Sequence, residues 1–129
     1  MVPTSPGRKT DMNSRFFLPL DERPDWLSYP KDFSILLERG LEEVGIWYFL
    51  ELPRIRERRK GLATRYTNRD LIPFATRDDN DDVACWDGRL GSSQVVVIHD
   101  FASPGFEERE VLPSFRSWYE FALRMSEDF

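Results

Sequence analysis

An uninterrupted aliphatic run, Val95-Val96-Val97-Ile98 within the segment Gln94–Asp100, sets the strictest condition on the fold of this chain. Successive side chains of a β-strand point to opposite faces of a sheet, so a run without polar residues indicates that both faces are covered. The run is far shorter than the ~20 apolar residues that a membrane-spanning helix requires. It therefore predicts a central strand with packing partners on both sides.

Three further segments have the length and composition of strands. Ile46–Leu52 is rich in aromatic and β-branched residues, and the shorter Leu71–Ala75 contains Pro73, which belongs at an edge or a bend. Asp82–Asp87 precedes the aliphatic strand, and Gly88–Ser93 between the two has the composition of a hairpin loop. The middle of the chain is therefore expected to form a sheet of short strands.

Two segments show the spacing of amphipathic helices. Pro30–Gly40 begins with a residue suited to the first helical position and ends with a glycine stop. The second helix is expected to begin at Pro113-Ser114, with Ser114 as its N-cap. Its apolar stripe consists of Phe115, Trp118, Tyr119, Ala122 and Met125. This order of elements predicts an α+β fold, a single domain in which helices pack on an antiparallel or mixed sheet.

Length and composition indicate one folded domain preceded by a polar arm. The chain has 129 residues, of which 40% are hydrophobic, enough for one core. Residues 1–14 are polar and contain two prolines and a glycine, so we expect a flexible arm at 1–14 and the α+β domain at 15–129. No apolar stretch follows the N-terminal charges as it would in a signal peptide, and a single Cys excludes a disulfide framework. We therefore expect a cytoplasmic protein.

Several short motifs resemble the SUKH superfamily of Smi/Knr-like domains. They are the Pro-Phe-Ala strand in Leu71–Ala75, the polar turn Asp78–Asp82, the aromatic strand Val83–Asp87 and the Ser-Phe-x-x-Trp sequence of Ser114–Trp118. Tyr29–Phe33 is similar to the first helix of that family, so the resemblance spans about residues 26 to 126. It implies a SUKH-like α+β domain without catalytic activity.

The resemblance also implies a kind of partner. Many bacterial members of the family are immunity proteins that bind a toxin and block its active surface, and others are regulatory or interaction modules. We therefore expect a cognate protein toxin as partner, with a nuclease as one candidate, and no cofactor. The formal net charge of −5 argues against general nucleic-acid binding, which depends on neutralising phosphates. We expect no contact with a membrane, and either a monomer or a weak homodimer.

The acidic run Asp78–Asp82 allows three interpretations. A calcium loop needs Asp or Asn at alternate positions, which Asp78, Asn80 and Asp82 supply. However, Val83 stands where glycine is required and Arg89 stands in place of the bidentate Glu. A polar turn between two strands is the second interpretation. The third is a surface that faces a partner, because adjacent carboxylates repel one another and are tolerated in solvent or opposite a cationic protein.

We assign the predicted partner-binding surface to this run and the strand after it. An exposed aromatic residue beside charged residues is the usual composition of a binding hot spot, and Trp86 is expected to supply it. The predicted contact residues are Asp78, Asp79, Asp81, Asp82, Trp86 and Asp87.

Two alternatives remain open at this point. The basic segment Arg54–Lys60 is expected to form a short helical turn or a loop. It supports the second hypothesis, a regulatory or scaffold module that binds an acidic partner or RNA. The alternative is that its charges pair with acidic residues of the same chain. An enzyme is the third hypothesis. His99 and Asp100 are adjacent in a strand and point to opposite faces, and Cys85 has no obvious base nearby. We therefore predict no catalytic residues and no metal site.

Overall fold

Each strand of the sheet pairs with its neighbours in the sequence, in the order β1-β2-β3-β4-β5-β6, and all pairs are antiparallel. The computed structural model describes residues 14–77 and 79–127, and so the predicted arm lies outside the described residues except for Ser14. The described elements are η1 (Leu20–Glu22), α2 (Lys31–Glu38), β1 (Glu43–Val44), β2 (Trp47–Phe49), α3 (Leu52–Arg65), β3 (Leu71–Arg77), β4 (Asp82–Asp87), β5 (Gly91–His99), β6 (Glu108–Leu112) and α4 (Phe115–Glu127). The α+β prediction is confirmed, and the sheet is antiparallel.

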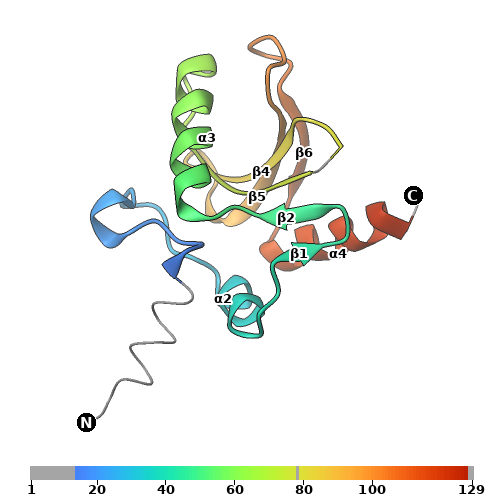
Figure 1. The fold of residues 1–129 in the computed structure, drawn as a ribbon. Helices are drawn as coiled ribbons and strands as arrows, with labels where there is room; N and C mark the ends of the chain where they lie inside the picture. Colours follow the sequence, from blue (N-terminus) through green and yellow to red (C-terminus); the bar gives the residue numbers. More distant parts are fainter. Residues whose placement is uncertain (1–13, 78, 128–129) are drawn as a thin grey trace.

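The sheet is covered on both faces, with α3 on one face and α2 and α4 toward the other (Figure 1). The central strand β5 shows this alternation directly. Val96 and Ile98 belong to the cluster beneath α3, whereas Val95 and Val97 belong to the larger core beneath α2 and α4. All four side chains are buried, which confirms the prediction of a central strand with packing on both sides.

Aromatic rings fill the larger core. Phe33 of α2 lies within 5.8 Å of the rings of Phe74 and Trp86 from the sheet and within 5.4 Å of the ring of Phe115 from α4. Edge-to-face contacts of this kind add to the stabilisation from apolar burial. The core therefore ties both helices of this face to β2 and β3, whose Phe49 and Phe74 contact rings of each helix.

The helix α3 corrects the expectation of a short turn or loop at residues 54–60. It runs for 14 residues, and Pro53, whose position marks the end of the predicted strand, lies in its first turn, where proline is tolerated. Ile55 and Leu62 are seven residues apart and form the buried stripe. The stripe is narrow because the remaining positions are mostly charged, so the segment resembles a basic loop when it is considered alone.

The helix α4 agrees with its prediction. The Ser114 hydroxyl accepts a hydrogen bond from the Ser117 backbone N–H at 3.1 Å, as an N-cap does. Phe115, Trp118 and Ala122 are buried on one side of the helix. No helix within residues 14–77 and 79–127 is long and apolar enough to cross the bilayer.

The edge strand β6 lies in a region for which the sequence predicts no strand. Four of its five residues are exposed, and three of these are charged. Val97 pairs with Glu110 and the next residue, Ile98, pairs with Glu108, so Arg109 is an extra residue in a β-bulge. Such a strand lacks the apolar alternation by which strands are recognised in a sequence.

Gly45, in the turn between β1 and β2, is a position where we expect a large loss of stability on substitution. Its φ is +61°, and an added Cβ would overlap the side chain of Ser126 in α4, whose hydroxyl accepts a hydrogen bond from the Ile46 N–H at 3.0 Å. Gly45→Ala is expected to lower the free energy of unfolding by about 3 kcal/mol, from backbone strain and overlap together. Urea denaturation provides the measurement.

Gly40→Ala is the matched control for this substitution. Gly40 also has a positive φ, +82°, but nothing lies within 4 Å of its added Cβ. We expect a loss of about 1 kcal/mol, from backbone strain alone. Equal losses for the two variants would contradict the proposed contact between the β1–β2 turn and α4.

Candidate protein-binding surface

The predicted acidic surface is divided by the fold. Asp79 and Asp81 are exposed in the turn between β3 and β4, and Asp78 lies outside the described residues. Asp82, Trp86 and Asp87 are buried, which corrects the expectation that they face a partner. Only the turn itself therefore remains available from the predicted set.

The Asp82 carboxylate is bound by cationic and polar groups of the same chain. It lies 2.9 Å from His99 Nδ1, and it accepts a hydrogen bond from Arg109 Nε at 3.0 Å. The Asn80 side chain accepts the Asp82 backbone N–H at 2.9 Å, as in an Asx turn. Two of the alternating residues of the calcium interpretation are therefore used in the turn, and no group of three metal-ligating side chains occurs among the described residues.

Trp86 and Asp87 point to opposite faces of β4. The Trp86 ring stacks on Phe74 with centroids 4.3 Å apart in the larger core. Asp87 faces the α3 side, where it accepts hydrogen bonds from Arg69 and Arg89, each at 2.8 Å. Burial opposes the charged form of Asp87, but the hydrogen bonds from Arg89 and Arg69 outweigh burial and keep the pKa of this carboxyl below its ordinary value.

Most arginines of α3 pair with carboxylates of the same chain. The Arg56 guanidinium binds Glu22, and Arg65 binds Asp100 through two hydrogen bonds of 2.6 Å. Arg58 also lies 3.3 Å from the buried Asp100 carboxylate. The α3 charges therefore serve to attach the helix to η1 and to the end of β5, which matches the interpretation that they pair within the chain.

The candidate catalytic groups are kept apart. His99 turns to Asp82 on the larger core side, and Asp100 turns to Arg65 on the α3 side, as their adjacent positions in a strand predict. Cys85 is fully buried beneath α3, and this burial raises the pKa of its thiol far above the ordinary value. A buried neutral thiol is a poor nucleophile.

The loop between β5 and β6, residues 100–107, presents the most conspicuous exposed apolar groups. Phe101 is 63% exposed and Phe106 is 80% exposed. Phe101 has φ +70°, and within the described residues it is the only non-glycine residue with a positive φ. The Arg65 guanidinium lies 4.1 Å from the centroid of its ring. A β-carbon at such a φ carries strain, and strained positions occur preferentially at functional sites.

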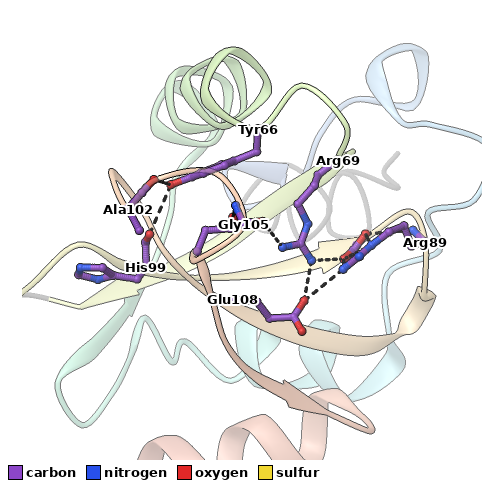
Figure 2. A network of polar contacts seen from close by, with 9 residues as sticks. Tyr66, Arg69, Arg89, His99, Ala102, Gly105 and Glu108 are labelled. Carbon is purple, nitrogen blue, oxygen red and sulfur yellow. Dashed lines mark hydrogen bonds and ion pairs between the residues drawn. The ribbon is translucent and has the colours of Figure 1, made fainter.

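Polar contacts hold this loop in one shape. Figure 2 shows the Tyr66 side chain reaching from the end of α3 to Ala102, whose carbonyl accepts its O–H at 2.8 Å. The Asp100 carboxylate accepts the Phe101 N–H at 2.9 Å, and the Glu107 carboxylate accepts the Gly105 N–H at 2.6 Å. Both ends of the loop are thus attached through carboxylates.

Arg69 is the centre of the attachment at the Glu107 end (Figure 2). It donates hydrogen bonds of 2.8 Å to Asp87, Glu107 and Glu108, and its side chain is only 7% exposed. Burial raises the pKa of Glu107, but hydrogen bonds from its own backbone N–H and from Arg69 prevail and leave this pKa below the ordinary value. The β5–β6 loop, β4 and β6 therefore meet at one guanidinium.

The loop and the acidic turn lie at the same end of the sheet. The Asp100 N–H donates a hydrogen bond to the Asp81 carbonyl at 3.1 Å. The Asp79 carboxylate is bound by Arg77, whereas within residues 14–77 and 79–127 no hydrogen bond or ion pair reaches the Asp81 carboxylate. We call Phe101, Phe106, Asp79 and Asp81 together the tip surface.

Sequence reasoning missed the aromatic half of the tip surface. The available signal was the Ser-Pro-Gly turn sequence at residues 103–105 with a phenylalanine next to the charged segment that follows it. A phenylalanine in a turn that leads into a charged strand has little apolar company, which favours exposure. Comparisons of the chain with protein-family models, with curated proteins and with solved structures found no match.

Proposed function

We propose that this chain is a non-catalytic protein-binding domain that contacts its partner through the tip surface. The observation that carries the proposal is the pair of exposed phenylalanines on a loop attached at both ends, one of them at a strained backbone position. Large aromatic side chains contribute most of the binding energy in many interfaces. A loop already fixed in shape loses little conformational entropy when it binds.

The partner that fits this surface has an apolar pocket beside basic residues. Phe106 is the side chain best placed to enter a pocket, because it is 80% exposed. Asp79 and Asp81 at the same end of the sheet favour cationic groups next to that pocket, and the net charge of −5 acts in the same direction. Association is therefore expected to slow as salt concentration rises.

The more specific proposal is an immunity protein that acts in the bacterial cytoplasm by occluding the active surface of a cognate toxin. It is supported by the resemblance of Leu71–Ala75 and Ser114–Trp118 to the SUKH superfamily. It is also supported by the candidate catalytic groups described above, because His99 and Asp100 bind different partners and Cys85 is buried. A regulatory or scaffold module without a toxin remains the second candidate. A toxin gene next to the gene for this chain would favour the first.

Two substitutions in the loop test the proposal. We expect Phe106→Ser to weaken binding to the product of the adjacent gene at least tenfold, as a lost hot-spot residue does. Phe101→Gly is expected to weaken binding similarly while changing the free energy of unfolding by less than about 1 kcal/mol, because relief of the positive φ offsets the lost contact with Arg65. Isothermal titration calorimetry and urea denaturation measure the two quantities.

Leu20→Ser is the matched control, since Leu20 is also 80% exposed but lies in η1. Its affinity for the partner should equal that of the unsubstituted chain. Equal affinity of all four proteins would exclude the tip surface. Replacement of Asp79 and Asp81 by Lys should lower the association rate and its dependence on salt, and an unchanged rate would remove the acidic turn from the proposal.

A further inference from the structure

A groove of about 470 Å³ lies between α2 and α4, on the side of the molecule away from α3 (Figure 1). Apolar side chains from both helices line it, and Leu123 of α4 is 41% exposed. The apolar lining residues are Ile35, Leu36, Phe115, Tyr119 and Leu123. The groove is separate from the tip surface, which lies at the end of the sheet near the β5–β6 loop.

Each helix contributes one acidic and one basic residue to the same groove. Asp32 of α2 and Arg39, the residue that follows the end of that helix, lie two turns apart. Arg116 and Glu120 lie one turn apart on α4. The two α4 charges approach each other only to 3.6 Å, and their side chains are 77% and 53% exposed. A pair so exposed contributes little stability within the monomer, so it leaves both charges available to another molecule.

We propose that this groove is the interface between two copies of the chain related by a two-fold axis. A two-fold axis perpendicular to α4 places the two α4 helices side by side and antiparallel. A residue near the start of one α4 then lies opposite a residue further along the other α4. Arg116 of each copy meets Glu120 of the other, so two ion pairs form beside the two Tyr119 side chains, which lie close to the axis.

This charge pattern is what singles out a second copy as the occupant. An interface between identical subunits must be complementary to itself, whereas a face for a different protein has no need for balanced charges. Here the two α4 charges that line the groove have opposite signs, so antiparallel pairing of the two α4 helices brings unlike charges together at both positions. Figure 1 places the β5–β6 loop far from α2, so both tip surfaces of the dimer stay accessible.

Charge reversal on α4 tests the dimer. Sedimentation velocity of the full chain is expected to show a species of twice 15.3 kDa whose fraction rises with concentration. Arg116→Glu alone, or Glu120→Arg alone, should raise the dimer dissociation constant at least tenfold, because like charges then face each other at two places. An equimolar mixture of the two variants should recover the dimer, since every pair across the interface is again of opposite sign.

Arg124→Glu is the matched control, because Arg124 is an exposed residue of α4 that does not line the groove. It should dimerise like the unsubstituted chain. Circular dichroism melting curves establish that all variants remain folded. The proposal would be overturned if the unsubstituted chain were a monomer at every concentration or if either single variant still dimerised. It would also be overturned if the mixture of Arg116→Glu and Glu120→Arg stayed monomeric. None of these outcomes depends on the partner of the tip surface.

Discussion

Replacement of Trp86 by alanine is expected to lower the free energy of unfolding by about 4 kcal/mol, the range found for large aromatic residues in a core. Trp86 is fully buried and contacts the rings of Phe74, Tyr29 and Phe33 at 4.3 to 5.2 Å. The cavity left behind would be lined by rings from the sheet and α2, which are too constrained by each other to collapse into it. Urea denaturation at neutral pH measures the loss.

The control for Trp86 is the exposed aromatic residue of the tip surface. Phe106→Ala should change the free energy of unfolding by less than about 0.5 kcal/mol, because Phe106 is 80% exposed. Trp86→Ala is thus expected to lose stability and keep partner binding, whereas Phe106→Ala is expected to keep stability and lose partner binding. If Trp86→Ala were as stable as the unsubstituted chain and lost binding, the initial assignment of Trp86 to the partner surface would be right after all.

Replacement of Asp87 by asparagine is expected to cost about 3 kcal/mol at neutral pH. The substitution removes one of the three carboxylates that bind Arg69, and the only one of them that is fully buried. Arg69 and Arg89 then lose a charged acceptor in the interior, which is strongly destabilising. The same loss should appear in the unsubstituted protein in acid. Urea denaturation from pH 7 to pH 2 measures both effects.

The direction of the pH dependence follows from the lowered pKa values of Asp87 and Glu107. A carboxyl whose pKa is lower in the folded state than its ordinary value, here 3.8 and 4.5, binds protons more readily when the chain is unfolded. Its stabilising contribution is complete above the ordinary value and is lost as the pH falls through the folded-state pKa. Stability should therefore decline below about pH 4.5, and less steeply in Asp87→Asn.

Asp70→Asn is the control for Asp87→Asn, because it shows how much stability is lost when a carboxylate outside the Arg69 network is removed. Asp70 is half exposed, accepts a hydrogen bond from Trp26 Nε1 at 2.8 Å and lies 3.9 Å from Arg59. An asparagine retains an acceptor for Trp26, so the loss should stay below about 1 kcal/mol. Equal losses for the two substitutions would show that the attachment through Arg69 contributes no special stability.

The elements with a strong apolar pattern were predictable from the sequence. The aliphatic run of β5, the stripe of α4 and the start and stop residues of α2 each carry local information, and the structure has them close to the expected bounds. The helix α3 and the strand β6 were not predicted, because their stabilising contacts are ion pairs and backbone pairing with distant parts of the chain. Arg65 with Asp100 is one such contact.

The candidate site was less predictable than the fold. Nothing local distinguishes Asp81, which is exposed, from Asp82, which is buried one residue later between His99 and Arg109. The difference is set by the register between β4 and β5 and by a bulge in β6, neither of which a run of aspartates reveals. Trp86 likewise lies beside Asp87 in sequence but on the other face of the strand.

The bulge in β6 also limits how these molecules can associate. A regular edge strand can pair with another chain and extend into open-ended aggregates, whereas an extra residue and several charges prevent continuous backbone pairing. At the other edge, β1 has only two residues. Because neither margin of the described sheet offers a long regular strand, we expect other molecules to be recognised through side chains, and copies of this chain not to assemble into open-ended sheets.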